Sequence, residues 1–261
     1  MKKIVRNIIR KVKKNFKIGT INYIGEYPSW ELAAADCVGY DSDIIFQKAI
    51  ESAQAVKNKQ AVYERDTVLF YEKTYNYPLI AYINKILLEF KNCKEIVDLG
   101  GAFGSTFMQN KDLLPVDIKW KIVEQKHVVE YGKENFEDNN LTFEYPIDAV
   151  QSNMCLVCSG ALQFIYNYKE YLDIIFQKKF ENIIIERTPF SNKSWIWIEI
   201  VKEPIYNASY PSYVFDETEF VNYFISNNYT LIDTFESLVD GKIEFNNKIV
   251  TWKSMIFKRN R

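Results

Sequence analysis

Two acids and a run of glycines are the residues of this sequence best suited to binding and chemistry. The apolar segment 95–99 contains Asp98 and leads into Gly100, Gly101 and Gly104. Glycine allows a tight turn and a close approach of the backbone to a ligand, because no Cβ stands in the way. The helix expected to follow points its free N–H groups at the same ligand. The segment therefore predicts a loop that cradles a nucleotide-like ligand.

A second acid ends the next apolar segment. Glu124 closes the segment 119–124, 26 residues after Asp98. An acid at the tip of the second strand is where doubly wound nucleotide folds hold ribose hydroxyls. The glycine spacing is G-G-x-x-G, whereas dinucleotide folds use G-x-G-x-x-G. This departure, together with the acid at 98, favours S-adenosylmethionine (SAM) over NAD.

In methyl transfer from SAM the cofactor brings the reactive carbon, and the protein supplies binding and orientation. We therefore expect separate contacts for the amino-acid end, the ribose and the adenine of SAM. Asp98 is expected to hold the ammonium, directly or through water, and a side chain at Gly101 would occupy the methionine end. Glu124 is expected to bind the ribose diol. The other expected contacts lie at strand tips and are Gln125, Tyr145, Pro146, Ser159 and Gly160.

His127 and Arg187 are the first candidates for chemistry on the acceptor. His127 is the only histidine, and histidine is the natural general base near neutral pH. Its place just after the second strand favours a helix-start or cofactor-edge role instead. Pro189 keeps the residue before it extended, so Arg187 can project into the crevice, where a guanidinium suits a phosphate-bearing acceptor. An ion pair with Glu186 or another acid is the alternative.

Further acceptor contacts are expected from two other segments. Arg65 either faces a carboxylate or phosphate at the mouth of the cofactor site or belongs to a surface ion-pair network. Tyr206, Tyr210 and Tyr213 belong to an insertion that follows the fifth strand. Because Tyr210 precedes a proline, its backbone is extended or turning and presents the phenol.

Strand and helix alternate from residue 95 onward in the manner of a parallel sheet. We expect strands at 95–99, 119–124, 141–145, 153–159, 181–186, 230–235 and 251–257, with helices near 104–113, 126–136, 166–179 and 216–227. Residues 195–202 alternate like an extra strand inside the insertion 190–213. Insertions after the carboxyl end of a strand form natural substrate walls, because ligands lie in the crevice beyond those ends.

The chain before this pattern divides into two parts. Residues 1–17 carry eight Lys and Arg and no acid, with an apolar residue every four positions. They predict an amphipathic helix within 1–24 that lies on an anionic membrane surface or a partner, or else docks on the body as a solvated basic helix. Residues 25–90 predict a helical cap, in which Ser29 caps one helix and Pro78 begins another. Residues 91–261 then form the SAM-binding domain.

Composition narrows the function classes further. The net charge of -1 offers no global field for nucleic acid. No apolar run reaches the ~20 residues that span a bilayer. Cys155 and Cys158 form C-x-x-C inside an apolar strand, without a histidine cluster, and with Cys37 and Cys93 they predict plain reduced thiols and no metal site. These features favour a cytoplasmic protein, peripheral to the inner face of the membrane if the basic helix binds there.

Seven short motifs follow one another from about Gly25 to the C-terminus. They are Tyr27-Pro28-Ser29-Trp30, Gly39-Tyr40-Asp41-Ser42, Tyr63-Glu64-Arg65-Asp66, Asp98-Leu99-Gly100-Gly101, Val123-Glu124-Gln125, Arg187-Thr188-Pro189-Phe190 and Ser209-Tyr210-Pro211. In this combination the sequence resembles a family of bacterial SAM-dependent methyltransferases associated with capsule and lipopolysaccharide gene clusters. Each motif alone is unspecific, whereas their order is specific.

The resemblance implies an α/β fold of class I: a Rossmann-like seven-stranded sheet whose last strand is antiparallel. It implies SAM at the glycine loop and Glu124, and an O-methyl acceptor that is a capsule or other surface-polysaccharide precursor. Some such methyltransferases accompany O-methyl phosphoramidate decoration, which would make the acceptor a phosphate-like oxygen on a small or nucleotide-linked precursor. In that case Arg65, Arg187, Tyr63 and Tyr210 would bind the acceptor, and no strong base would be needed.

Two other classes of function stay open on the sequence. A catalytically silent protein of the same fold could scaffold a glycan-assembly complex through the basic N-terminus. A Rossmann-type oxidoreductase or epimerase could bind NAD at the same loop. SAM, S-adenosylhomocysteine and NAD binding distinguish the three classes.

Overall fold

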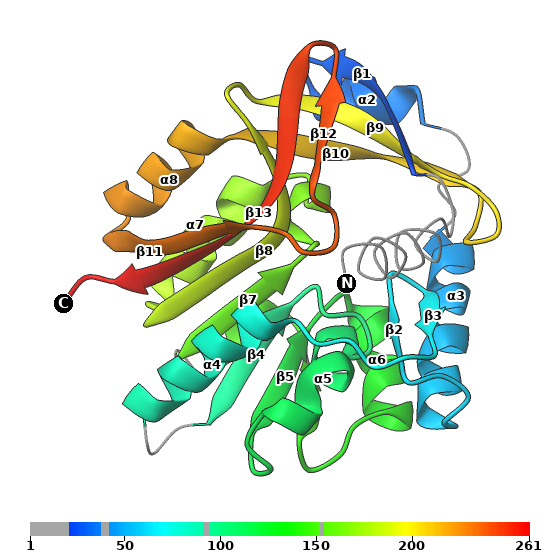
Figure 1. Cartoon of the computed structure of the whole chain (residues 1–261), viewed down its shortest axis with the longest axis vertical. Helices are drawn as coiled ribbons and strands as arrows, with labels where there is room; N and C mark the ends of the chain where they lie inside the picture. Colours follow the sequence, from blue (N-terminus) through cyan, green and yellow to red (C-terminus); the bar gives the residue numbers. More distant parts are fainter. Residues whose placement is uncertain (1–20, 38–41, 91–93, 152–153) are drawn as a thin grey trace, which may run out of the picture.

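Seven strands build the central sheet of the computed structural model, which describes residues 21–37, 42–90, 94–151 and 154–261. The strands are β4 (Glu95–Leu99), β5 (Lys119–Val123), β6 (Leu141–Glu144), β7 (Cys155–Ser159), β8 (Asn182–Ser191), β11 (Tyr229–Glu236) and β13 (Lys248–Arg259). They lie in the order β6-β5-β4-β7-β8-β13-β11 (Figure 1). The first five run parallel, and β13 is antiparallel to both β8 and β11. This order and the antiparallel last strand confirm the predicted fold class.

Helices cover both faces of this sheet. The helices α4 (Tyr77–Glu89), α5 (Ser105–Asn110) and α6 (Lys126–Asn135) pack on one face, and α7 (Tyr168–Gln177) and α8 (Glu217–Ser226) pack on the other. Successive strand residues point to opposite faces, so Ile96 joins the first core cluster while Val97 and Leu99 join the second. Asp98 follows the alternation of Ile96 and therefore lies on the α4–α6 face.

Three further strands extend the sheet beyond β8. The one next to β8 pairs with it in parallel at Phe215 and Asp216, and the other two are added by antiparallel pairing. The three strands are β1 (Asn22–Tyr27), β9 (Trp195–Val201) and β10 (Ala208–Asp216), in the order β1-β9-β10-β8. In Figure 1 they lie above the parallel strands β4, β5 and β7. The extra strand at 195–202 is confirmed, whereas β1 and β10 were not predicted. The insertion 190–213 is therefore part of the sheet, and its expected role as a substrate wall stays a prediction.

The strand β8 passes through its expected end and contains a bulge. It was predicted to close at Glu186, but it continues to Ser191 and pairs with β13 along most of its length. The register shifts where Ile185 pairs with Met255 and Thr188 pairs with Lys253. Arg187 lies in this shift with φ +52°, a left-handed conformation that costs a non-glycine residue ~1–3 kcal/mol. The bulge redirects the side chains at the tip of β8.

The segment 25–90 contains the expected helices together with strands that were not expected. The helix α2 (Trp30–Ala35) begins at Ser29, whose hydroxyl accepts from the Leu32 N–H, and α3 spans Ser42–Lys57. Pro78 lies in the first turn of α4, as predicted. Between α3 and α4 a hairpin is formed by β2 (Tyr63–Arg65) and β3 (Val68–Phe70). The prediction of a mostly helical cap was therefore wrong for β1 and for this hairpin.

The remaining elements are short. They are the strand β12 (Lys242–Phe245), which pairs with β13, and the 3₁₀ turns η1 (Lys111–Leu113), η2 (Ile147–Ala149) and η3 (Leu162–Phe164). Residues 1–20 lie outside the described residues, and with them the predicted basic helix. Within the described ranges, no helix has the length and apolarity needed to cross a membrane.

The C-x-x-C pair lies in β7, in the centre of the sheet. Cys155 and Cys158 are both buried and unbridged. Burial raises the pKa of Cys158 to about 12 and that of Cys155 further. Both thiols are thus protonated core groups, which confirms their interpretation.

Candidate active site

A cavity of about 1400 Å³ opens at the carboxyl ends of the parallel strands. Residues that follow β4, β5 and β7 line it on one side, and residues of β9 and β10 line it on the other. A pocket for one small ligand has a volume of ~300–1,000 Å³. This cavity therefore has room for a cofactor and an acceptor together.

The glycine loop between β4 and α5 forms one wall of the cavity. Gly100 has φ +74°, Ala102 +48° and Gly104 +94°, so the chain turns through the left-handed region three times. A Cβ at Gly100 would lie 2.3 Å from the Cβ of Ala161. Glycine is therefore needed at position 100 both for the turn and for the close packing against the segment after β7.

The expected contact of Asp98 with the cofactor is not what the geometry provides. Asp98 is fully buried on the α4–α6 face, does not line the cavity, and accepts a hydrogen bond of 2.9 Å from the Trp120 indole. A Cβ at Gly101 would meet the Asp98 carboxylate at 2.6 Å and Ile122 at 2.8 Å. Position 101 thus points into the core and not toward a methionine end. Asp98 lies beneath the loop, where burial raises its pKa to about 7.

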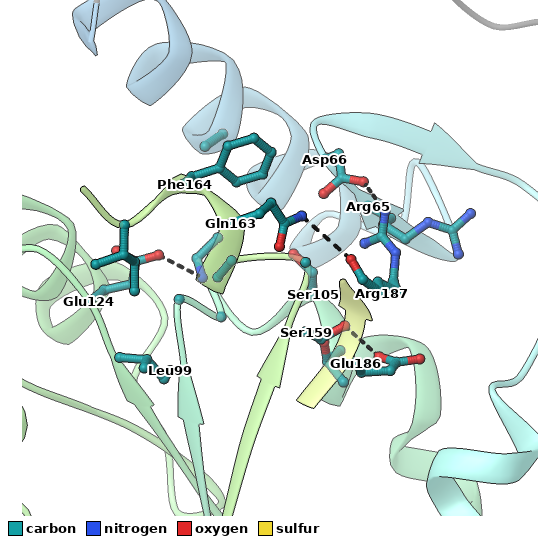
Figure 2. A pocket seen from close by; sticks show the side chains of 18 of the residues that line it. Arg65, Asp66, Leu99, Ser105, Glu124, Ser159, Gln163, Phe164, Glu186 and Arg187 are labelled. Carbon is teal, nitrogen blue, oxygen red and sulfur yellow. Dashed lines mark hydrogen bonds and ion pairs between the residues drawn. The ribbon is translucent and has the colours of Figure 1, made fainter. Parts of the chain in front are cut away.

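Glu124 lies at the tip of β5, as predicted, and lines the cavity (Figure 2). One carboxylate oxygen accepts from the Ala102 N–H at 3.2 Å, and the other accepts from the Gln125 N–H at 2.9 Å. Burial raises the pKa of this half-buried carboxyl. A carboxylate has about four lone-pair sites, so two remain for hydroxyl donors. Glu124 therefore fits the predicted role of a ribose acceptor.

The expected adenine contacts gather beside Glu124. Gln125, His127, Tyr145 and Pro146 all line the cavity. The ring of His127 packs edge-on against Phe46 with centroids 4.7 Å apart. His127 lies in the first turn of α6, next to the acid at the tip of β5. This place agrees with the cofactor-edge alternative and not with a base for the acceptor.

The tips of β7 and β8 are joined by a buried carboxylate. Glu186 is 3% exposed and accepts hydrogen bonds from the Ser159 hydroxyl and the Asn76 amide. The Gly160 N–H donates to the Glu186 carbonyl at 2.9 Å. Burial raises the pKa of Glu186. These contacts fix Ser159 and Gly160 opposite the glycine loop, where both line the cavity as expected.

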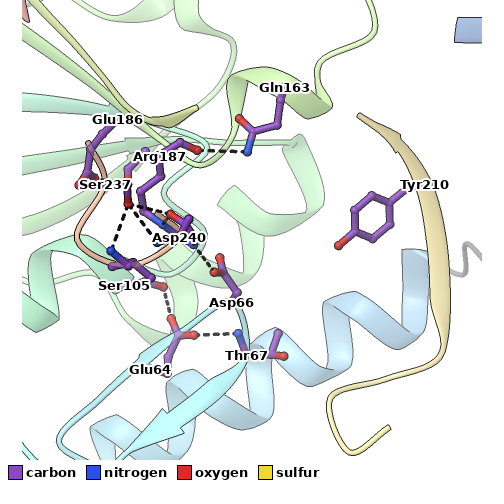
Figure 3. A network of polar contacts seen from close by, with 12 residues as sticks. Glu64, Asp66, Thr67, Ser105, Gln163, Glu186, Arg187, Tyr210, Ser237 and Asp240 are labelled. Carbon is purple, nitrogen blue, oxygen red and sulfur yellow. Dashed lines mark hydrogen bonds and ion pairs between the residues drawn. The ribbon is translucent and has the colours of Figure 1, made fainter. Parts of the chain in front are cut away.

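Arg187 lines the cavity, but its charge is already matched. Its guanidinium forms ion pairs with Asp66 at 2.7 Å and Asp240 at 3.0 Å, and its carbonyl accepts from Gln163 (Figure 3). Although burial lowers the pKa of the guanidinium, Asp240 and Asp66 raise it well above its usual value. The ion-pair alternative therefore holds for Arg187. A free cation that holds an anionic acceptor is not present at this position.

Tyr63 and Arg65 of β2 were also expected to bind the acceptor, but only one of them lines the cavity. Tyr63 is fully buried, does not line the cavity, hydrogen-bonds Thr74 at 2.6 Å and stacks on Phe70. The prediction that it contacts the acceptor is therefore wrong. Arg65 does line the cavity, and its guanidinium lies 4.9 Å from the Phe70 ring centroid. Among the residues that the structure describes, no acid forms an ion pair with Arg65.

The sequence reasoning missed several polar groups of this cavity. Glu64, 7% exposed, accepts from Ser105 and from the Thr67 N–H, and burial raises its pKa to about 7. The Gln163 carbonyl oxygen is buried and has no hydrogen-bond partner in the described part of the chain. Glu199 is the one acid of the apolar strand β9. That interruption was a readable signal. Glu64 lies in the motif Tyr63-Glu64-Arg65-Asp66, where only its neighbours were given roles, and nothing in the sequence indicated a role for Gln163.

Acids outnumber bases in the cavity lining. The acids are Glu64, Asp66, Glu124, Asp148, Glu186, Glu199 and Asp240, and the bases, His127 apart, are Arg65, Lys126 and Arg187. Burial raises the pKa of Glu64 to about 7 and that of Glu199 to about 8, so these two carboxyls are not counted as full negative charges. The other five acids still outnumber the three bases. This excess disfavours an anionic acceptor, because an added negative charge would meet carboxylates in a partly desolvated site. No group of described residues has the arrangement of a metal site.

Methyltransferases are among the solved structures that this chain resembles in fold. The N-terminal domain of EvdMO1, crystallised with S-adenosylhomocysteine and D-fucose, matches at 11% identity and TM-score 0.49, covering 86% of this chain and 100% of that chain. The amino pentose methyltransferase CalS10 from Micromonospora echinaspora matches at 8% and 0.46, covering 72% and 92%. A SAM-dependent methyltransferase from Clostridium acetobutylicum matches at 10% and 0.44, covering 83% and 99%.

No protein-family model and no curated protein matches the sequence. Identities this low, with TM-scores below 0.5, carry no functional inference, so the function must be argued from the cavity. The strand order of the sheet is that of the class I methyltransferase fold.

Proposed function

We propose that this chain is a SAM-dependent methyltransferase. The observation that carries the proposal is the pairing of the left-handed glycine loop with Glu124, whose carboxylate bonds the loop backbone and keeps free lone pairs toward the cavity. A cofactor with a nucleoside and an amino-acid end matches a cradle of this kind at the tips of β4 and β5. SAM, when bound, supplies an electrophilic methyl group.

Each part of the cradle has a defined task under this proposal. The backbone of residues 100–104 supports the amino-acid end, and Glu124 accepts from the ribose hydroxyls. Gln125, Tyr145 and Pro146 border the adenine. Ser159 and Gly160, held by Glu186, close the opposite side. Asp98 lies beneath the loop, where it accepts from the Trp120 indole and fills the space that a side chain at Gly101 would need.

The acceptor that the cavity favours is a neutral, hydroxyl-bearing small molecule. The excess of carboxylates and the matched charge of Arg187 speak against the phosphate or phosphoramidate oxygen expected from the sequence. Tyrosines from β1 and β10 and Trp252 offer aromatic faces on which a sugar ring can pack. A surface-polysaccharide precursor, nucleotide-linked or free, is the acceptor class to be tested first.

The test is calorimetric titration with SAM, S-adenosylhomocysteine and NAD. We expect the first two to bind, and Glu124→Ala to weaken them by ~1–3 kcal/mol, the order for losing a charged acceptor. Glu130→Ala, on the exposed face of α6, is the matched control and should bind as the wild type does. Binding of NAD in place of SAM would move the chain to the oxidoreductases. SAM binding without transfer to any acceptor would favour the scaffold.

A further inference from the structure

Three polar side chains form a row across the antiparallel strands that face the cradle. In the sheet register Tyr23 of β1 lies opposite Glu199 of β9, and Glu199 lies opposite Tyr210 of β10. Residues directly opposite each other point to the same face of a sheet. All three line the cavity, so the row Tyr23–Glu199–Tyr210 presents a carboxylate between two phenols to whatever occupies the cavity.

Glu199 is a buried acid on the face of β9 that lines the cavity. It is 8% exposed, and its neighbours along β9, Ile198 and Ile200, belong to an apolar cluster on the other face. No ion pair of the described residues includes it. A carboxylate so deeply buried is costly unless it is hydrogen-bonded or has a task. Tyr210 provides a hydrogen bond to it, and the cavity lies on its open side.

We propose that Glu199 is the general base that accepts the proton of an acceptor hydroxyl, with Tyr23 and Tyr210 as positioning residues beside it. This inference rests on the proposed function, because it needs a methyl donor in the cradle. It names the acceptor as an alcohol, since an anionic oxygen or a thiolate would need no such base.

The step balances without any further reactant. The hydroxyl oxygen bonds to the methyl carbon as the carbon–sulfur bond breaks, its electron pair stays on sulfur, and the hydroxyl proton moves to the Glu199 carboxylate. Glu199 returns the proton to water after the product has left the cavity. The hydroxyls of Tyr210 and Tyr206, 3.4 Å apart, lie on the same side of the cavity. Figure 3 shows the Tyr210 hydroxyl pointing toward the Arg187–Asp240–Asp66 network across the cavity.

The surroundings of Glu199 raise its pKa, which makes it a stronger base than an ordinary carboxylate. Burial, and then the charges of Asp66 and Asp240, raise the pKa of Glu199 to about 8, while Arg187 and the Tyr210 hydrogen bond oppose the rise. Tyr23 faces it from β1, and burial followed by the charge of Glu199 raises the pKa of that phenol in turn. A carboxylate with an ordinary pKa would be too weak for an alcohol, and efficiency is greatest when the catalytic pKa lies near the working pH.

The experiment measures methyl transfer from labelled SAM to a panel of neutral sugars, nucleotide-linked sugars, sugar phosphates and amines. We expect transfer to hydroxyl groups with a rate that rises with pH and levels off above about 8. Glu199→Gln should lower kcat by ~10²–10⁴-fold, abolish the pH dependence and leave the Kd for SAM unchanged. Glu199→Asp should restore part of the rate. Glu203→Gln, at an exposed site of the same insertion, is the control and should match the wild type.

A second measurement separates a base from a structural carboxyl. Because the folded-state pKa of Glu199 is raised, its ionisation destabilises the folded state as pH increases toward 8. Glu199→Gln should therefore be at least as stable as the wild type at pH 8 while it loses activity. A variant that is both less stable and weaker in SAM binding would show a structural role and overturn the proposal.

Failure of this inference and failure of the proposed function give different results. If the wild type does not bind SAM, the proposed function fails. If it binds SAM but transfers methyl only to phosphate oxygens or amines, the base assignment fails alone. If it binds SAM and transfers methyl to no compound of the panel, the methyltransferase proposal fails with it and the scaffold is favoured. Full activity of Glu199→Gln on a hydroxyl acceptor would also overturn the base assignment and leave the methyltransferase intact.

Discussion

The two sides of the cavity are built in different ways. The cradle side comes from the ends of β4 and β5 and consists largely of backbone, shaped by Gly100, Ala102 and Gly104 and held by one carboxylate, Glu124. The opposite side, here called the acceptor wall, consists of side chains of β1, β8, β9 and β10 and of the two turns that carry Asp66 and Asp240. The residues of the cradle side lie close together in the sequence, whereas the acceptor wall brings together residues that lie far apart in the sequence.

This difference suggests a division of labour. A cofactor common to many enzymes can be held by backbone geometry, which a local glycine pattern encodes. An acceptor that differs from one enzyme to the next needs side chains whose pairing the sheet register decides. The acceptor wall accordingly holds the buried acid Glu199 and the two ion pairs of Arg187. Changes on the cradle side should affect stability and cofactor binding, and changes in the wall should affect turnover.

The largest effect is expected for Gly101→Val. The new side chain would be forced against the Asp98 carboxylate and Ile122, at 2.6 and 2.8 Å from its Cβ. Overpacking of a dense core costs typically ~1–3 kcal/mol and occasionally more, and here we expect about 3 kcal/mol or more. Urea denaturation measures the loss of unfolding free energy. This differs from the sequence-based expectation that the valine would block the cofactor in an intact fold.

Gly101→Ala in an Ile122→Val background sharpens this test. Ile122→Val removes the Cδ1 atom that a Cβ at Gly101 would meet, so the alanine should cost less in that background than in the wild type. Gly101→Ala with wild-type stability but lost affinity for S-adenosylhomocysteine would restore the interpretation of Gly101 as the methionine end.

The second effect is expected in the acceptor wall. Arg187→Met keeps the volume and the backbone bulge but leaves Asp240, 22% exposed, and Asp66, 64% exposed, without their cation. Removing one partner of a buried pair costs ~3–5 kcal/mol, and because Asp66 is well exposed we expect about 1–3 kcal/mol. Arg187→Lys should lose less. Thermal unfolding with and without SAM measures both, and the shift produced by SAM should be the same in variant and wild type. A loss of that shift would place Arg187 in the cradle.

The contrast between the two sides also explains how much the sequence predicted. The five parallel strands were predicted because strand and helix alternate along this part of the chain. Strands β11 and β13 were predicted from their own apolar patterns, without knowledge of their partners. Strand β10 was missed because Pro211 argues against a strand. Its N-terminal part lies beside β9 alone, since β10 pairs with β8 only at Phe215 and Asp216. Strand β1 was missed because its partner β9 lies far along the sequence.

Site residues that a local sequence pattern defines were predicted, and those that depend on long-range strand pairing were missed. Glu124 could be predicted because a strand tip and the preceding glycines define its place. Tyr63 and Asp98 were assigned to ligands by motif, but alternation along their own strands directs them into the core. Glu199 is the single acid of an apolar strand but was missed, and only the register with Tyr23 and Tyr210 gives it a role.

A third prediction concerns the pH dependence of stability that Glu64 causes. Glu64 of β2 bonds Ser105 at the start of α5, and burial raises its pKa to about 7 in the folded chain. The unfolded chain releases this proton near the ordinary glutamate value, so the folded state loses stability as pH rises from there to about 7. In Glu64→Gln the amide oxygen can still accept from the Thr67 N–H, and the amide nitrogen can donate to the Ser105 hydroxyl, which in the wild type donates to Glu64. It should therefore gain on the order of 1–2 kcal/mol relative to the wild type between pH 5 and pH 8.

Equilibrium unfolding at pH 5 and pH 8 measures this gain. Glu244→Gln, at a position in β12 that is not buried, is the control and should show no such change between the two pH values. An equal difference between Glu64→Gln and the wild type at both pH values would mean that Glu64 is ionised throughout, and the carboxylate would then count among the anionic groups of the cavity.

The smallest effect distinguishes the two arginines of the cavity. Arg187 is matched by two acids, whereas Arg65 stacks on Phe70 and forms no ion pair within the described residues. If the cavity binds any anionic group, such as a ligand carboxylate, Arg65 is the guanidinium whose charge is not already matched by an acid.

Arg65→Lys keeps the charge but loses the planar stacking and the two-pronged hydrogen bonding. We expect a loss of less than ~1 kcal/mol in stability, the order of an exposed cation–π contact, and a loss of similar size in SAM affinity. Calorimetry at low and high salt measures the second loss, which should shrink as salt screens the charge. An Arg65→Lys variant with unchanged SAM affinity but a raised acceptor KM would assign Arg65 to the acceptor and not to SAM, and would give the acceptor wall the cation that Arg187 cannot supply.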